Sequence, residues 1–233
     1  MIPWREIGRA AVPGEDAPLV LSQHGDEFVI RIGPHALMSS AAHGSEEALA
    51  EQALARIAAL AGARVLVGGL GMGFTLAAAL RRLPPNAEVV VCELVPAIVE
   101  WNRGSLAHLA NRPLDDPRVS VRVCDVELVV RESAVAFDAI LLDVDNGPNG
   151  ITRRSNDRLY SQEGLRAAFR ALRPGGVLGL WSVAPDREFS SRLAEVGFSV
   201  EETTARARRT KGGRHTLWLA TRGKVGSAKK GER

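Results

Sequence analysis

The sequence has little cysteine: among 233 residues only Cys92 and Cys124 are present, and each lies inside an apolar run. Their spacing does not match a close-spaced metal-ligand pattern, so we expect no bound metal ion. A free cysteine in apolar surroundings behaves as a small hydrophobic residue. We therefore expect two buried thiols in a reducing compartment.

Long apolar runs are also missing. No uncharged apolar stretch reaches the roughly 18 residues that a membrane-spanning helix needs, and residues 1–6 lack the apolar centre of a signal peptide. These absences predict a cytoplasmic protein without a membrane partner. A hydrophobic content of 45% with 24% charged residues is typical of a globular chain with one main domain.

Acidic residues are missing near the C-terminal end of the sequence. Segment 204–221 carries five basic residues and no acidic one, and segment 222–233 adds a net charge of +4. Because the whole chain has a net charge of +3, residues 1–203 carry −6. The basicity is therefore confined to a hairpin and to the tail 222–233, which we expect to be disordered. This distribution does not favour a nucleic-acid-binding face.

Apolar strand-like runs alternate with helical patterns over much of the chain. Such alternation predicts βαβ units and a parallel sheet whose strands are buried on both faces. Helices are expected between the strands, and Pro84-Pro85 and Pro174-Gly175-Gly176 end two of them. The expected parallel strands lie at 65–67, 89–91, 119–123, 139–142 and 177–181.

The predicted fold is therefore α/β, with a doubly wound, mostly parallel, Rossmann-like sheet over residues 41–221. Runs near Phe198 and at 216–220 suggest an antiparallel edge to this sheet. A helix is expected over 45–60, because apolar residues recur there at helical spacing. Before it, residues 1–40 contain two extended runs around a polar turn, which predict a small β-hairpin.

A glycine-rich segment follows the first parallel strand and includes Gly69, Gly71 and Gly73. Glycine allows a tight turn and lets a ligand approach main-chain atoms that a Cβ would block. A glycine pattern alone is weak, but here it stands between a buried strand and a helix, as a nucleoside-binding loop requires.

Three carboxylates follow the ends of three expected strands: Glu93, Asp125 and Asp143. The carboxyl ends of parallel strands share one edge of a sheet, and ligands bind beyond that edge. Glu93 lies 20 residues after Gly73, a spacing typical of an acid that accepts both ribose hydroxyls. We therefore predict that these acids converge on one nucleoside-binding crevice.

The segment after Asp143 is rich in turn-forming residues, including Asp145 and Asn146. A turn-rich loop over a rigid scaffold often carries function, which makes Asp145 and Asn146 candidate substrate contacts. Simple turn capping by the two side chains is an equally good interpretation.

Taken together, these motifs resemble those of the spermidine synthases, within the class I methyltransferase fold, over about residues 19 to 200. The matching motifs are Gly68-Gly69-Leu70-Gly71-Met72-Gly73, Glu93, Asp125, Asp143 to Pro148, Leu159-Tyr160-Ser161 and Leu172 to Gly176.

The resemblance implies a cofactor, a substrate class and roles for individual residues. S-adenosylmethionine or its decarboxylated form would be the cofactor, and a small nucleophile, most simply an amine, the substrate. Glu93 would hold the ribose, Asp125 and Val126 would contact the adenine, and Asp143 would lie beside the reacting amine. A small N-terminal β-segment before the nucleoside domain is also a family feature.

Two departures from the family pattern bear on the reaction. Met72 stands where the family has an Asp in the glycine loop that grips the aminopropyl amine. Leu37-Met38 and Ser45-Glu46 stand where the family has a Gln and a Tyr-His pair. Met72 favours methyl transfer, whereas the overall likeness favours aminopropyl transfer.

Our first hypothesis is an enzyme that transfers a methyl or aminopropyl group from a sulfonium nucleoside to an amine. Asp143 or Asp145 would orient the amine and accept its proton. A catalytically inactive nucleoside-binding protein is the second hypothesis, and a nucleic-acid methyltransferase using the basic hairpin is the third. The sequence is compatible with a homodimer.

Overall fold

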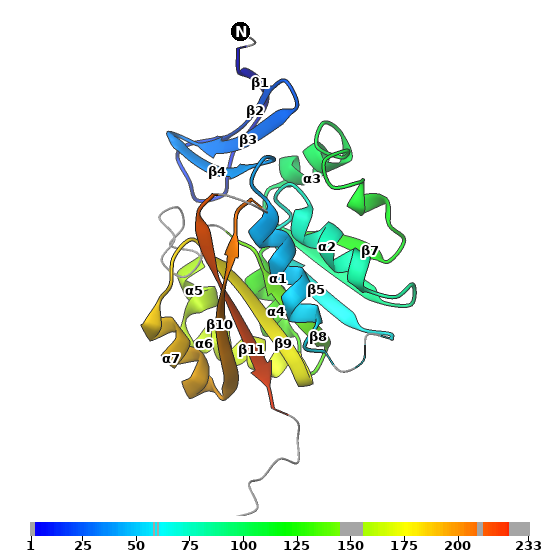
Figure 1. The fold of residues 1–233 in the computed structure, drawn as a ribbon, viewed down its shortest axis with the longest axis vertical. Coiled ribbons are helices and arrows are strands. Elements are labelled where there is room, and N and C mark those ends of the chain that lie inside the picture. The colour runs from blue at the N-terminus through cyan, green and yellow to red at the C-terminus, as the bar shows by residue number, and fades with distance from the viewer. Residues whose placement is uncertain (1–2, 58, 60, 145–155, 209–211, 224–233) are drawn as a thin grey trace, which may run out of the picture.

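The computed structural model describes residues 3–57, 59, 61–144, 156–208 and 212–223. Two sheets organise these residues, a small one at the N-terminal end and a large one flanked by helices (Figure 1). The large sheet confirms the predicted α/β fold, and the small sheet is more extensive than the predicted hairpin.

The N-terminal sheet has four antiparallel strands in the order β1-β2-β3-β4. They are β1 (Arg5–Ala10), β2 (Leu19–His24), β3 (Glu27–Ile32) and β4 (His35–Ser39). The predicted hairpin is β2 and β3; β2 begins with alternating buried and half-buried side chains, and β3 is mostly buried. The strands β1 and β4 were not predicted. Three of the six residues of β1 are charged, and β4 has only five residues, so neither shows the run of apolar residues that marks a buried strand.

The large sheet has the order β10-β11-β9-β8-β5-β6-β7. Five neighbouring strands of this sheet are parallel, namely β9, β8, β5, β6 and β7. The strands β11 and β10 add the predicted antiparallel edge beside β9. The strands are β5 (Arg64–Gly68), β6 (Glu88–Glu93), β7 (Val119–Val123), β8 (Phe137–Leu142), β9 (Leu172–Ser182), β10 (Phe198–Arg206) and β11 (Arg214–Arg222).

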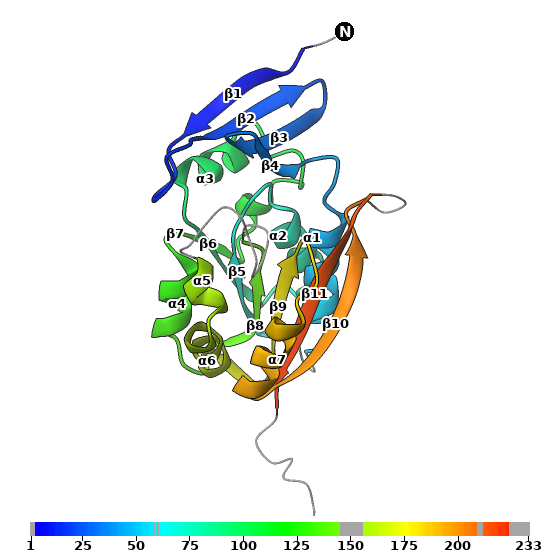
Figure 2. The same ribbon diagram turned by 90° about the vertical axis from the view of Figure 1, so that its left-hand side faces the viewer.

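Helices connect these strands and cover both faces of the large sheet (Figure 2). The first helix ends at residue 54 instead of continuing to residue 60. Arg56 and Ile57 donate their backbone amides to carbonyls three residues back, which tightens the chain into a turn. The helices are α1 (Gly44–Leu54), α2 (Phe74–Arg82), α3 (Pro96–Arg103), the 3-10 turn η1 (Pro113–Asp115), α4 (Val126–Glu132), α5 (Asn156–Tyr160), α6 (Gln162–Ala171) and α7 (Arg187–Val196).

Alternate residues of the central strands face opposite helical layers. In β5, Val65 and Val67 belong to a core shared with α1, α2 and the N-terminal sheet. Leu66 belongs to a second core shared with α4, α6 and α7. All three side chains are fully buried, which explains the unbroken apolar run in the sequence.

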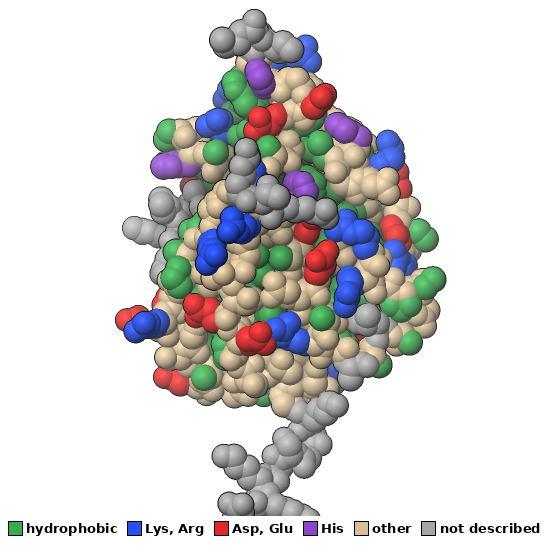
Figure 3. Space-filling model, in the orientation of Figure 1, with side chains coloured by type: hydrophobic (Ala, Val, Ile, Leu, Met, Phe, Trp, Pro, Cys, Tyr) green, Lys and Arg blue, Asp and Glu red, His purple; other side chains and the backbone are tan. Residues whose placement is uncertain are grey.

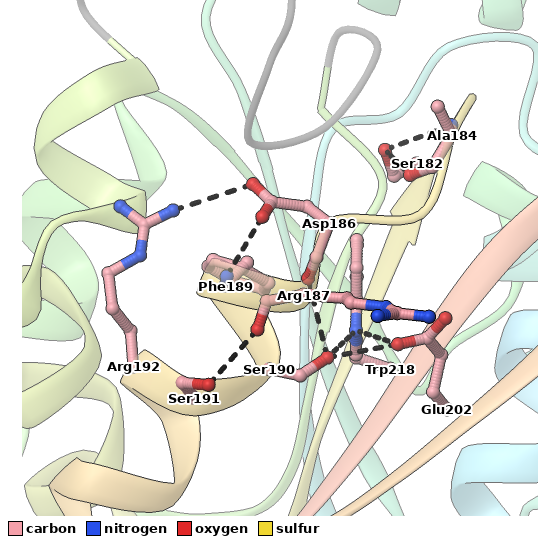
Figure 4. A network of polar contacts seen from close by, with 10 residues as sticks. All are labelled: Ser182, Ala184, Asp186, Arg187, Phe189, Ser190, Ser191, Arg192, Glu202 and Trp218. Atoms are coloured by element: carbon pink, nitrogen blue, oxygen red, sulfur yellow. Dashed lines mark hydrogen bonds and ion pairs between the residues drawn. The ribbon is translucent and has the colours of Figure 1, made fainter.

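A polar network fixes α7 against the antiparallel edge (Figure 4). Asp186 caps the helix by accepting the Phe189 amide at 3.0 Å. The Nε1 of the fully buried Trp218 donates to the Ser190 hydroxyl at 2.8 Å, and that hydroxyl donates to Glu202 at 2.9 Å. The network satisfies the indole of β11 and ties α7 to β10 and β11.

Candidate functional site

The loop between β5 and α2 turns at the carboxyl end of the central strand. Gly69 donates its amide to the Cys92 carbonyl at 2.9 Å and has a φ of +86°. A Cβ at this position would collide with the Asp143 carbonyl oxygen. Glycine is therefore required here both by the left-handed backbone and by the close approach of β8.

Glu93 ends β6 and holds this loop in place. Its carboxylate accepts the Leu70 amide at 3.0 Å and the Val95 amide at 2.8 Å, and the side chain is buried. These two bonds fix the Glu93 carboxylate at the edge of the first parallel strands.

A pocket opens beyond the carboxyl ends of β5, β6, β7 and β8; we call it the first pocket. Six of the seven residues predicted to carry cofactor binding or catalysis line it: Gly69, Gly71, Glu93, Asp125, Val126 and Asp143. The three strand-end acids thus converge on one cavity, as the sequence predicted. Val12, Leu19, Ile30 and Ile32 of the N-terminal sheet and the chain after β1 form another part of its wall, which the sequence analysis did not anticipate.

Gly73 does not line the first pocket. It is the N-cap of α2 with a φ of +84°, and a Cβ there would press on Asn102 and Pro113. The sharp entry into the helix and the close packing are sufficient to require glycine at this position.

Asp125 has a structural role beside its place in the pocket. One of its carboxylate oxygens accepts the Glu127 amide at 2.9 Å and caps α4. The following Val126 packs against Gly68 at the end of β5. Cap and strand end together fix how both residues face the cavity.

Asp143 follows β8 and lies between two cavities. Its carboxylate accepts the Thr75 hydroxyl at 2.5 Å, and its amide donates to the Gly68 carbonyl at 2.9 Å. Thr75 is in the first turn of α2, so the loop, the helix and β8 all position this acid. The Thr75 hydroxyl is also 3.3 Å from the Glu46 carbonyl oxygen.

A second pocket shares Leu37, Met38, Gly71 and Asp143 with the first. The residues that belong to it alone include Glu46, Met72, Phe74, Trp181 and His215. Met72 therefore faces the second pocket, and Phe74 and Trp181 give that pocket aromatic surface. The Trp181 Nε1 is buried, and the described residues offer it no hydrogen-bond partner.

Glu46 is a site residue that the sequence analysis did not select. Burial and, next, the negative charge of Asp143 raise the pKa of Glu46 to about 7. A hydrogen bond from Ser45 opposes this shift. A carboxyl group that titrates near neutral pH beside a second carboxylate is suited to exchange protons.

The two cysteines line the first pocket beside the acids. Cys92 is buried as predicted, whereas Cys124 is half-buried because it follows the exposed edge strand β7. Burial and the neighbouring Cys124 raise the pKa of Cys92 to about 12. Cys92 is thus a protonated thiol at neutral pH and serves as apolar wall.

Some predictions fall on segments that the structure does not describe. The candidate substrate residues Asp145 and Asn146 lie outside the described residues, as does most of the tail 222–233. Over the described ranges, no cluster of three or more His, Cys, Asp or Glu side chains is arranged to hold a metal ion. No described helix has the length and apolar character needed to cross a membrane.

Comparison with known proteins gives this site a family. Residues 44–187 match the spermine/spermidine synthase domain, which is well over half of the chain. The chain belongs to the spermine/spermidine synthase family. The matched range covers the glycine loop, all three strand-end acids and Glu46.

Named relatives agree with this assignment. Polyamine aminopropyltransferases of Mycobacterium tuberculosis are 38% identical over 128 residues, 53% of this chain and 24% of theirs. The Nitrosomonas europaea polyamine aminopropyltransferase is 34% identical over 122 residues, 52% of this chain and 36% of its own. The chain therefore spans about a quarter to a third of the curated relatives that it matches.

Solved structures of spermidine synthases share the fold. The Thermotoga maritima enzyme superimposes with a TM-score of 0.74 at 19% identity, covering 94% of this chain and 73% of that chain. A spermidine synthase in complex with the transition state analogue AdoDATO gives the same values. At this identity the likeness confirms the fold, including the N-terminal sheet before the large one.

Proposed function

We propose that this chain transfers an aminopropyl group from decarboxylated S-adenosylmethionine to a small amine. The observation that carries the proposal is that two pockets meet at Asp143. The first pocket has the acids and the apolar wall to hold a nucleoside, and the second offers a carboxylate and aromatic side chains to an amine.

The charges of the site favour the decarboxylated donor over S-adenosylmethionine. Four acids line the two pockets, namely Glu46, Glu93, Asp125 and Asp143. No Lys or Arg is among the lining side chains in the described part of the chain. The decarboxylated donor carries only positive groups, a sulfonium and an ammonium, whereas S-adenosylmethionine also brings a carboxylate that these acids repel.

In the first pocket we assign the nucleoside to the strand-end acids. Glu93 would accept the ribose hydroxyls, because it lines the first pocket and its carboxylate is fixed by the Leu70 and Val95 amides. Asp125 and Val126 would contact the adenine. The apolar wall supplied by the N-terminal sheet would exclude water from the base.

The reaction needs an amine without its proton. Asp143 would orient the amine and accept a proton, and the neutral nitrogen would attack the carbon next to the sulfonium in line with the C–S bond. The C–N bond forms as the C–S bond breaks. The electron pair of the C–S bond stays on the sulfur, and the leaving group is the neutral thioether methylthioadenosine. Positioning across the two pockets supplies most of the rate.

Calorimetric titration with each nucleoside tests the donor. We expect methylthioadenosine and decarboxylated S-adenosylmethionine to bind, the latter at least tenfold more tightly than S-adenosylmethionine, which is about 1.4 kcal/mol. Tighter binding of S-adenosylmethionine would favour methyl transfer instead. If none of the three binds to the folded protein, the proposed function is wrong.

A further inference from the structure

A chain of polar side chains links Glu46 to His215. The Ser45 hydroxyl donates to the Glu46 carboxylate at 2.6 Å and lies 2.8 Å from Nδ1 of His215 on β11. Ser45 is fully buried, whereas His215 is partly exposed. The three groups therefore connect the Glu46 carboxyl to a histidine that lines the same pocket and is partly exposed to solvent.

On the inner side, Glu46 approaches Asp143. Both acids line the second pocket, and the Thr75 hydroxyl contacts the Asp143 carboxylate and the Glu46 carbonyl together. Two carboxylates that share one apolar-walled cavity favour a state with a single negative charge and one proton. This pair is what an incoming ammonium group would meet.

We propose that Glu46 and Asp143 form a proton-sharing pair in the acceptor pocket, and that Ser45 and His215 carry the amine's proton from Glu46 to solvent. This inference rests on the proposed function and adds to it a proton route. It assigns a catalytic role to Glu46 and positioning roles to Ser45 and His215.

The proton balance of the step is complete. The substrate ammonium gives one proton to the ionised member of the pair, and its nitrogen becomes the neutral nucleophile. When Glu46 holds a proton, Glu46 gives this proton to the Ser45 oxygen. In the same step the Ser45 hydroxyl gives its own proton to Nδ1 of His215. His215 then releases a proton to water. The product is a secondary ammonium, so each transfer releases one proton overall.

The ionisation behaviour of the two ends fits this route. The pKa of Glu46 is raised to about 7 by burial and by Asp143, and burial lowers the pKa of His215 from 6.5. His215 is thus neutral at neutral pH and can receive a proton at Nδ1. Its ring packs edge-on against Trp181, with centroids 4.6 Å apart, which fixes its orientation.

Other charged groups near Glu46 must be included in any reading of its titration. Glu47 on the same helix raises the Glu46 pKa further, although less than Asp143 does. Glu47 itself is engaged by Arg81 at 3.1 Å and faces His43 at 3.7 Å. Among the described groups, Asp143 and Glu47 act on Glu46 directly. His215 is linked to it through Ser45.

The kinetic test uses the full chain with decarboxylated S-adenosylmethionine and putrescine. We expect kcat of the wild type to rise with pH through about 7. Glu46→Gln lowers kcat about 100-fold and removes this limb of the profile. The matched control is Glu51→Gln, which changes an exposed acid on the same helix. It leaves kcat and the pH profile of kcat unchanged.

Proton transport is separated from simple packing by chemical rescue. Ser45→Ala and His215→Ala lower kcat without changing KM, and added imidazole buffer restores part of the rate by carrying the proton itself. Ser45→Thr, which keeps a hydroxyl, retains the wild-type rate. If imidazole has no effect on either variant, or Ser45→Thr is as slow as Ser45→Ala, the relay is wrong.

Infrared spectroscopy tests the carboxylate pair without any turnover. The wild type should show a carboxylic-acid C=O band that disappears as the pH rises through about 7 and that is missing in Glu46→Gln. Absence of this band in the wild type overturns the pair even if transfer occurs. If the band behaves as expected but no donor and amine react, the proposed function is wrong and the pair stands.

Discussion

The Thr75 hydroxyl donates a hydrogen bond of 2.5 Å to the carboxylate of Asp143. The bond joins the first turn of α2 to the end of β8, directly where the two pockets meet. It therefore ties the glycine loop, which helps to line the first pocket, to the acid that we assign to the amine.

Replacement of Thr75 by Val keeps the side-chain shape and removes this donor. A hydrogen bond to a charged group contributes about 1.5–3 kcal/mol, so we expect Thr75→Val to lower the free energy of unfolding by that amount and to reduce kcat. Urea unfolding measures the first effect. Ser191→Ala is the control, because its hydroxyl bonds only the exposed backbone of α7, and it should change little.

Glu93→Ala should weaken nucleoside binding. It removes the acceptor of the ribose hydroxyls and releases the Leu70 and Val95 amides, and we expect a loss of about 1.5–3 kcal/mol in calorimetry. Arg208→Ala, an exposed change in the basic hairpin, is the control and should bind as the wild type does. An unchanged dissociation constant for Glu93→Ala would place this acid outside the site.

Gly69→Ala should be far more damaging than an ordinary glycine substitution. The backbone at this position has a φ of +86°, which is strained for alanine, and the new Cβ would also collide with the Asp143 carbonyl oxygen. Gly14→Ala is matched to it, with a φ of +81° and nothing within 4 Å of the new Cβ. We expect Gly14→Ala to cost about 1 kcal/mol of stability and Gly69→Ala clearly more, together with the loss of nucleoside binding. Equal thermal unfolding of the two variants would contradict the close approach of β8.

Stability should depend on pH through Glu46. Its pKa is raised from 4.5 to about 7, so the folded state favours the neutral carboxyl, and this contribution is present below about pH 4.5 and lost as the pH rises through 7. Glu46→Gln is neutral at every pH. We therefore expect it to unfold like the wild type near pH 4.5 and to be more stable above pH 7, by up to about 3 kcal/mol. For the control Glu51→Gln, the difference in the free energy of unfolding from the wild type should not change with pH.

Much of the lining of the first pocket could be predicted because it depends on local order in the sequence. Each strand-end acid directly follows a buried run, and parallel strands bring their ends to one edge. Gly69 and Glu93 could be placed in this way without knowledge of packing. Asp125 also lies on this pocket, as its place after a strand predicts, although its capping of α4 was not foreseen.

The second pocket could not be predicted because its parts meet only through long-range packing. Ser45 and His215 are 170 positions apart and come together because α1 packs beside β11. Nothing near His215 in the sequence marks it, since it stands in a basic hairpin that has no apparent motif. Glu46 was noted only as a departure from the family's Tyr-His pair, and nothing in the sequence placed its side chain beside Asp143.

On the face drawn in Figure 3, Lys and Arg side chains are interspersed with Asp and Glu and form no continuous field. A nucleic-acid-binding protein carries its basic residues as a patch or stripe.

The transfer reaction itself tests the central claim most directly. The chain is incubated with decarboxylated S-adenosylmethionine and putrescine, and in parallel with S-adenosylmethionine and putrescine, and the products are identified by mass spectrometry. We predict methylthioadenosine and a putrescine that has gained one aminopropyl unit, in the first reaction only and strongly reduced in Asp143→Asn. A methylated amine with S-adenosylhomocysteine in the second reaction, or no product from either donor, would contradict the account.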